Sequence, residues 1–187
     1  MNLRNAIKHF KTIRTHRKYV RKFCFMCGLY KQDLLHDLSK YSPIEFFESV
    51  KYYQGTRSPI DACKEENGYS MAWLHHRGRN LHHYEAWTDN YDKGTTTIKM
   101  PWKYALEQFC DYLGAGVAYS GGIEKFSMWE EVKWWKEKRK TAKMHPDTLR
   151  LMDDLFLSAW DKGIKRTLID KRYLNNIRRA YEKWRSL

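Results

Sequence analysis

The chain has 187 residues and a mass of 22.7 kDa, which is enough for one domain with a substantial hydrophobic core. Its composition is 42% hydrophobic and 30% charged, which is typical of a globular protein and excludes a disordered chain. No apolar run approaches the roughly 18 residues that cross a bilayer, and the basic N-terminus lacks the apolar stretch of a signal peptide. We therefore expect a cytoplasmic protein with no membrane partner and with reduced cysteines.

The net charge of +13 is concentrated at the two ends of the chain. Residues 1–31 contain nine basic residues and no acidic one, and residues 162–187 contain nine basic residues and two acidic ones. Such ends favour an anionic partner, either a small phosphorylated substrate or a nucleic acid. Basic helix faces that only contact solvent would give the same charge pattern, so both interpretations stay open.

The first third of the chain contains three predicted helices. Apolar residues recur every three or four positions over residues 3–27, and Gly28 is a natural stop. His16 lies on this apolar stripe and is expected to point inward. A short helix carries the sequence DLLHDL, and Ser42-Pro43-Ile44-Glu45 has the form of a capping box that opens a third helix. Residues 55–69 are polar and are expected to form a loop.

The stretch WLHHRGRNLHHYEAW, residues 73–87, holds two histidine pairs in a helical pattern. On an unbroken helix His76 and His83 would be about 10.5 Å apart along the axis. Two ligands of one ion need donor atoms within roughly 4 Å of each other. The pairs can therefore serve one site only if the helix breaks. Gly78, through a positive φ, and Asn80 favour a break at residues 78–80.

The second half of the chain shows further helical signals. Pro101 opens a helix through Tyr119, Ser127 caps another, and Pro146 and Gly163 bound the next. A basic amphipathic helix, TLIDKRYLNNIRRAYEKW, follows at residues 167–184. No segment has sustained apolar–polar alternation. The sequence thus predicts an all-α single domain over residues 1–187, a helical bundle of about eight helices.

Several residues could hold a metal. His36-Asp37 offers an imidazole and a carboxylate, both suitable ligands for a divalent cation, and His16 is an inward-facing candidate on the preceding helix. Asp111 lies among apolar residues, where an acid must be paired, exposed or ligating. Lys40 follows His36 by one helical turn and is positioned to contact a phosphate oxygen near the metal.

This arrangement resembles the HD-domain superfamily of metal-dependent phosphohydrolases: His16, then His36-Asp37, then Asp111. HDLSK resembles the HD-x-x-K form of its cyclic-dinucleotide phosphodiesterases. The Gly-Tyr-Pro sequence that marks those enzymes does not follow here, which argues against that substrate. HDLSKYSPIEF and WLHHRGRNLHHYEAW together look like a family of uncharacterised bacterial and phage proteins. The resemblance covers about residues 9–120, an HD-like metal-site core, and leaves a C-terminal helical extension over about residues 121–187.

The resemblance implies an HD-domain-like fold and a phosphohydrolase that acts on a nucleotide or another phosphoester with one or two divalent ions (Mn, Fe, Zn, Ni or Mg). The implied metal ligands are His16, His36, Asp37, His76, His82, His83 and Asp111. Asp37 and Lys40 are the candidate catalytic residues, and Lys40, Arg77, Arg79 and Asn80 are candidates for binding the substrate. Two alternatives remain open: a di-iron oxygenase that uses the same ligands, and a non-enzymatic protein that binds nucleic acid through its basic terminal helices.

Overall fold

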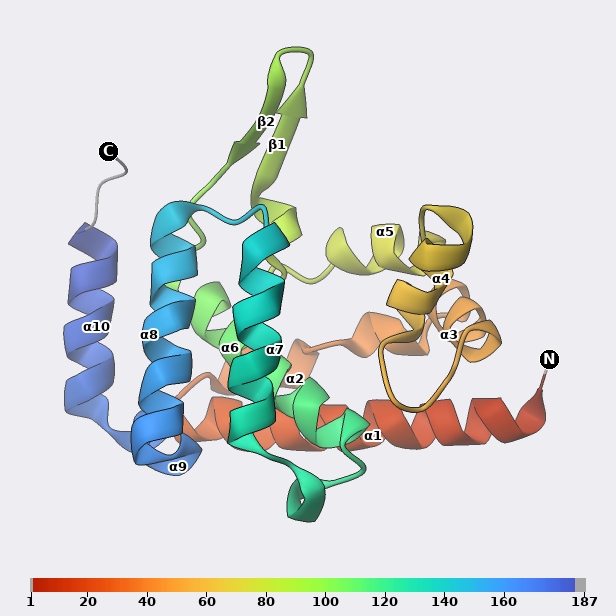
Figure 1. The fold of residues 1–187 in the computed structure, drawn as a ribbon, viewed down its shortest axis with the longest axis horizontal. Helices are drawn as coiled ribbons and strands as arrows, with labels where there is room; N and C mark the ends of the chain where they lie inside the picture. The colour runs from red at the N-terminus through yellow and green to blue at the C-terminus, as the bar shows by residue number, and fades with distance from the viewer. Residues whose placement is uncertain (1, 184–187) are drawn as a thin grey trace.

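The structure is a computed structural model that describes residues 2–183, apart from the side chain of Asp33. Its helices are α1 (Leu3–Met26), α2 (Tyr30–Leu35), α3 (Pro43–Lys51), α4 (Pro59–Asn67), α5 (Met71–Arg77), α6 (Trp102–Tyr119), α7 (Met128–Thr141), α8 (Pro146–Lys162), α9 (Ile164–Ile169) and α10 (Lys171–Lys183). Short 3-10 segments lie at η1 (Leu38–Tyr41), η2 (Tyr84–Trp87) and η3 (Ile123–Lys125). The all-α prediction is confirmed (Figure 1). Within residues 2–183 no helix has the length and apolar character needed to cross a membrane.

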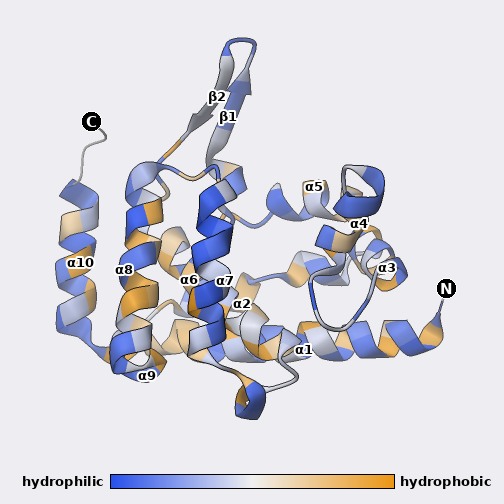
Figure 2. Cartoon of the chain, viewed as in Figure 1, coloured by the Kyte–Doolittle hydropathy of each residue, from blue (hydrophilic) through white to orange (hydrophobic). Residues whose placement is uncertain are grey.

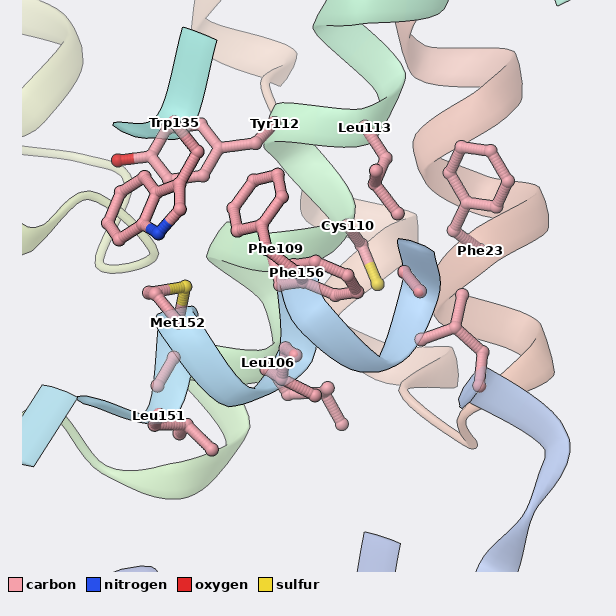
Figure 3. Close-up of a cluster of buried hydrophobic side chains, with 14 of the residues drawn as sticks. Phe23, Leu106, Phe109, Cys110, Tyr112, Leu113, Trp135, Leu151, Met152 and Phe156 are labelled. Atoms are coloured by element: carbon pink, nitrogen blue, oxygen red, sulfur yellow. The ribbon is translucent and has the colours of Figure 1, made fainter. Parts of the chain in front are cut away.

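The core lies where α1, α6, α7 and α8 meet. Phe109 and Tyr112 of α6 pack against Phe156 of α8, and the Trp135 ring of α7 stacks on Phe156 with 5.1 Å between the ring centroids (Figure 3). In Figure 2, α7 is largely hydrophilic along its visible surface, whereas α6 and α8 carry hydrophobic segments. This aromatic cluster fixes α6, which carries two of the residues in the candidate site.

Close contact between α1 and α6 depends on Gly114. A Cβ atom at this position would lie 2.4 Å from Val20 Cγ2 and 3.1 Å from Val20 N. Without a side chain at Gly114 the two backbones approach each other, so residues on the facing surfaces of α1 and α6 come within hydrogen-bond distance.

Three elements differ from the sequence prediction. Part of the expected loop at 55–69 is α4, which begins at Pro59 and ends at Asn67, followed by the C-cap Gly68 with φ 81. Its buried face, which includes Ala62 and Cys63, is too short to show periodicity. The antiparallel strands β1 (Thr88–Tyr91) and β2 (Gly94–Thr97) form a hairpin that projects from the bundle (Figure 1). Both of its faces are largely exposed, so no apolar alternation marks it.

The predicted C-terminal helix is also divided into two. Asp170 adopts an extended conformation between α9 and α10, and its Oδ1 accepts a hydrogen bond from the backbone N–H of Tyr173. Aspartate is a preferred N-cap, so Asp170 starts a new helix instead of continuing the old one. Trp184, where the predicted helix ended, lies outside the described residues.

Candidate metal centre

Helices α1 and α6 bring His16 and Asp111 together. Both side chains are buried at the interface that Gly114 permits, and His16 Nε2 lies 3.1 Å from Asp111 Oδ1. His16 points inward, as its place on the apolar stripe of α1 predicts. There it faces a polar group, the carboxylate of Asp111.

The His36-Asp37 pair reaches the same point from the turn between α2 and η1. Asp37 has φ 55 and is the one non-glycine residue with positive φ between residues 2 and 183. Aspartate tolerates this left-handed conformation better than most residues, and such strained positions cluster at functional sites. His36 Nε2 lies 3.3 Å from His16 Nε2 and 3.2 Å from Asp111 Oδ1.

These residues form a first donor group, which we call site 1: His16, His36, Asp37 and Asp111. Five distances among His16 Nε2, His36 Nε2, Asp37 Oδ2 and Asp111 Oδ1 lie between 2.8 and 3.3 Å. A tetrahedron with edges of about 3.2 Å has its centre about 2.0 Å from each corner, which is a zinc–nitrogen or zinc–oxygen bond length. The spacing of site 1 thus fits a divalent metal.

The histidine pairs of residues 75–83 converge because α5 ends at Arg77. The backbone N–H and the side-chain Nδ2 of Asn80 both donate to the carbonyl of His76, which turns the chain back. His76 Nε2 then lies 2.9 Å from His83 Nε2. The predicted break is confirmed, but not through a positive φ at Gly78, whose φ is −72°. The two hydrogen bonds from Asn80 to the His76 carbonyl make the turn.

A second donor group, site 2, comprises Asp37, His76, His82 and His83. Asp37 Oδ1 lies 3.2 Å from His76 Nε2 and 3.6 Å from His82 Nε2. Asp37 Oδ2, the other oxygen of the same carboxylate, is 2.8 Å from His16 Nε2 in site 1. The Asp37 carboxylate thus offers one oxygen to each donor group.

Two glutamates that sequence reasoning missed orient these histidines. Glu107 Oε1 lies 3.0 Å from His36 Nδ1 and 3.1 Å from His82 Nδ1. Glu45 contacts His76 Nδ1 at 2.8 Å and His75 Nδ1 at 2.6 Å. Each contact leaves the Nε2 atom of His36, His76 and His82 directed at a donor group, as carboxylates do behind metal-binding histidines.

The sequence did contain a signal for both glutamates. Glu107 is four residues before Asp111, so the two acids share one face of α6. Glu45 was interpreted as part of a capping box. The helix does begin at Pro43, but the Ser42 side chain makes no capping hydrogen bond, and the Glu45 carboxylate points at the histidines.

Burial and mutual charge set the protonation of the site. Burial opposes the charged form of Asp37, but His36, Lys40 and His76 outweigh it and hold the pKa of Asp37 well below its usual range. Burial likewise opposes the charge on His36, but Asp37, Asp111 and Glu107 raise its pKa well above the usual value. Burial, with the neighbouring imidazoles of His82 and His76, lowers the pKa of His83, so His83 stays in the neutral form that binds a metal.

Among the described residues seven buried side-chain polar atoms have no hydrogen-bond partner, and three of the seven are Asp37 Oδ1, His82 Nε2 and Asp111 Oδ1. Leaving such atoms unpaired costs about 1–3 kcal/mol each. All three belong to the donor groups. A cation between these groups would satisfy them, and with the imidazole and carboxylate chemistry this means that the buried cluster could bind a metal ion.

Comparison with family models identifies the family of the chain. A family model described as a family of unknown function, DUF5662, matches residues 5–157, which is 153 of the 187 residues. The chain belongs to DUF5662. No curated protein and no solved structure matches it. The DUF5662 match spans all residues of sites 1 and 2 as well as Glu45 and Glu107, so the whole cluster lies in the part of the chain that defines the family.

The candidate metal centre of this DUF5662 chain lines a cavity of about 570 Å³. His16, His76, His83 and Asp111 form part of its wall, and Lys40 lies beside them. The Lys40 ammonium contacts Asp37 Oδ2. Burial alone would lower the pKa of Lys40, but Asp37 and Asp111 raise it above its usual range, so the side chain is a permanent cation at the cavity wall.

The other predicted substrate-binding residues of the DUF5662 chain lie elsewhere. Arg77 and Arg79 are not among the residues that line the cavity, and Arg79 donates to the His75 carbonyl. Asn80 is buried and donates to Ser39 as well as to His76, so it shapes the turn, and it is not among the residues that line the cavity. The cations that do line the cavity besides Lys40 are Arg57 and Lys138, which sequence reasoning did not identify.

The cavity wall also includes a carboxylate and aromatic rings. Glu131 of α7 lies against Gly116 of α6, where a Cβ atom would be 2.0 Å from Glu131 Oε1. Burial raises the pKa of Glu131 to about 7. Trp73 and Trp134 also line the cavity. This wall can therefore contact an apolar or planar group and supply a proton near neutral pH.

Proposed function

We propose that this protein is a metal-dependent phosphohydrolase that acts on a nucleotide or another phosphoester. The observation that carries the proposal is the Asp37 carboxylate, which directs Oδ2 at site 1 and Oδ1 at site 2 beside a cavity. Bound divalent ions would supply Lewis acidity, which lowers the pKa of water and neutralises charge on a phosphoryl group.

The protein's own residues would hold and orient the reactants. His16, His36, Asp37 and Asp111 would hold one ion, and Asp37, His76, His82 and His83 a second one. Lys40 is the cation that both contacts Asp37 and lines the cavity, so it would bind a phosphoryl oxygen of the substrate. Glu107 and Glu45 would keep the imidazoles in place during turnover.

The order of these residues in the chain also supports the proposal. A histidine on a first helix, a His-Asp pair, two further histidine positions and a last aspartate on a later helix resemble the HD-domain superfamily. The same set would suit two irons in an oxygenase. Lys40, Arg57 and Lys138 line the cavity and favour a phosphate substrate, although Arg57 pairs with Glu65. Six carboxylates line the same cavity, those of Glu45, Asp61, Glu85, Asp111, Glu130 and Glu131.

The test is a hydrolysis assay on protein reconstituted with Mn, Fe, Zn, Ni or Mg. Substrates would be bis-p-nitrophenyl phosphate, p-nitrophenyl phosphate and nucleoside monophosphates. We expect hydrolysis that Asp37→Ala abolishes and that Lys40→Gln lowers at unchanged metal content. Lys51→Gln, an exposed lysine on α3, is the matched control and should leave activity unchanged.

Metal-loaded protein that hydrolyses none of these phosphoesters would contradict the phosphohydrolase proposal. Dioxygen uptake by the iron-loaded protein, without hydrolysis, would instead support the oxygenase.

A further inference from the structure

The outward face of α1 is strongly basic and is separate from the candidate metal centre. Over its 24 residues α1 carries eight basic side chains and no acidic one. Its apolar residues, among them Ile13, Val20 and Phe23, are buried against the bundle. The exposed basic residues on the opposite side include Lys11, Arg14, Lys18, Arg21 and Lys22; we call this surface the α1 basic face.

Part of this face is concave. A surface hollow of about 580 Å³ is lined by Lys11, Arg14, Thr15, Arg17, Lys18, Arg21 and Tyr41. Five of these seven residues are cations. Their mutual repulsion in one hollow would be relieved by a polyanion, since each phosphate that pairs with a cation also releases a counterion.

Exposed aromatic rings lie at both ends of the basic face. Phe10 contacts Tyr41 with ring centroids 5.8 Å apart, and Phe25 contacts Tyr30 with centroids 5.2 Å apart. The four side chains are 36–59% exposed, so these rings are open to solvent. Phe10 and Phe25 are separated by about 22 Å along the helix axis. An extended strand of about four nucleotides spans that distance, and unpaired bases stack on exposed aromatic rings.

We propose that the α1 basic face binds single-stranded nucleic acid, with the phosphates in the hollow and bases on the two aromatic pairs. A duplex fits less well because its bases are already stacked on one another. An anionic membrane fits less well because an interfacial helix needs an apolar face toward the lipid, and that face of α1 is buried in the core.

The surface lies close to the metal centre without being part of it. Arg17 lines the hollow, and its Nε donates to the His36 carbonyl at 3.0 Å. Tyr41 of the hollow is the neighbour of Lys40 in η1. The proposal rests on the charge and the aromatic rings of α1 and holds whether or not the metal centre hydrolyses phosphoesters.

The test is fluorescence anisotropy with a 5′-labelled 20-nucleotide oligo(dT) strand in EDTA, at several salt concentrations. Five phosphate contacts predict a slope of log affinity against log salt of about −3.5. Lys11→Gln/Arg14→Gln/Lys18→Gln should weaken binding at least tenfold at low salt and reduce the slope to about −1.4. Lys171→Gln/Arg172→Gln/Arg179→Gln on α10 removes the same charge elsewhere and should change affinity less than twofold.

A second variant tests the aromatic part. Phe10→Ala/Phe25→Ala should weaken binding at least fivefold at every salt concentration without changing the slope. Circular dichroism of each variant checks that the fold is kept. The proposal is overturned if a 20-base-pair duplex binds as tightly as the single strand, or if the α10 variant weakens binding as much as the α1 variant. Binding to phosphatidylserine vesicles but not to the strand would also overturn it.

Two measurements of strand affinity separate this proposal from the phosphohydrolase proposal: wild-type protein in EDTA, and the Asp37→Ala variant. Unchanged affinity under both conditions supports α1 as the binding surface even if no hydrolysis is found. Affinity that depends on metal would place the strand at the metal centre and refute the role of α1.

Discussion

Glu107 should control the metal affinity of both sites, because one oxygen of its carboxylate contacts a histidine of each. Glu107 Oε1 lies 3.0 Å from His36 Nδ1 in site 1 and 3.1 Å from His82 Nδ1 in site 2. Glu107→Gln keeps an acceptor oxygen of nearly the same size but removes its charge. A hydrogen bond to a charged group contributes about 1 kcal/mol more than a neutral one, so two such bonds lose about 2 kcal/mol. That corresponds to about 30-fold weaker metal binding overall.

The assay is a competitive titration of metal-free protein with Zn²⁺ or Mn²⁺ against a chromogenic chelator, which resolves two binding steps. Glu107→Gln should weaken both steps. Glu45→Gln should weaken only one binding step. Among the described residues, the histidines that Glu45 contacts are His75 and His76, and of these only His76 belongs to a donor group, site 2. His145→Asn is the control: it replaces a histidine at the start of α8, outside both sites, with another good N-cap.

Less than a threefold change in either binding step for Glu107→Gln would refute this reasoning. So would an equal loss for His145→Asn, since that would show a general effect of losing a buried side chain. Near-identical circular dichroism spectra for the variants would be required in either case.

Three further predictions concern stability. Burial and Lys40 lower the pKa of His9 to about 4. Below pH 6.5 the unfolded chain binds this proton first, so His9 should contribute a loss of about 2–3 kcal/mol of stability between pH 7 and pH 4.5. In urea unfolding, His9→Gln should therefore lose less stability over this pH range than the wild type, by about that amount. Gly114→Ala should destabilise by about 1–3 kcal/mol in the same assay because its Cβ clashes with Val20, and an unchanged urea midpoint would contradict this. Gly78→Ala should be neutral or stabilise by up to about 1 kcal/mol and should retain metal. The reason is that φ of Gly78 is −72° and that a Cβ atom there would lie 3.5 Å from its nearest neighbour. Loss of metal would show that the turn needs glycine.

The helices that pack against the core could be predicted from the sequence because burial imposes a period of three to four residues on them. α1, α6 and α8 were found in this way, with Gly28 and Gly163 near their ends. The hairpin and α4 could not, because exposed strands and short polar helices bury too little to leave a pattern. The division of the C-terminal helix at Asp170 depends on one side chain that caps α10, which periodicity does not register.

The candidate ligands could be predicted because metal-binding side chains are chemically distinctive and their order in the chain resembles a known superfamily. The break at residues 78–80 followed from geometry alone, since His76 and His83 cannot meet on a continuous helix. The roles of Glu45 and Glu107 depend on contacts with histidines 25 or more residues away in the sequence. The cations of the cavity, Arg57 and Lys138, are likewise brought there only by the tertiary fold.

The most direct test of a bridged two-metal centre is the metal-to-protein ratio of purified, reconstituted protein, measured for wild type beside Asp37→Ala. Because Asp37 offers one oxygen to each site, we predict two equivalents of divalent metal in the wild type and the loss of both in the variant. No bound metal in the wild type, or two equivalents retained by Asp37→Ala, would contradict the account.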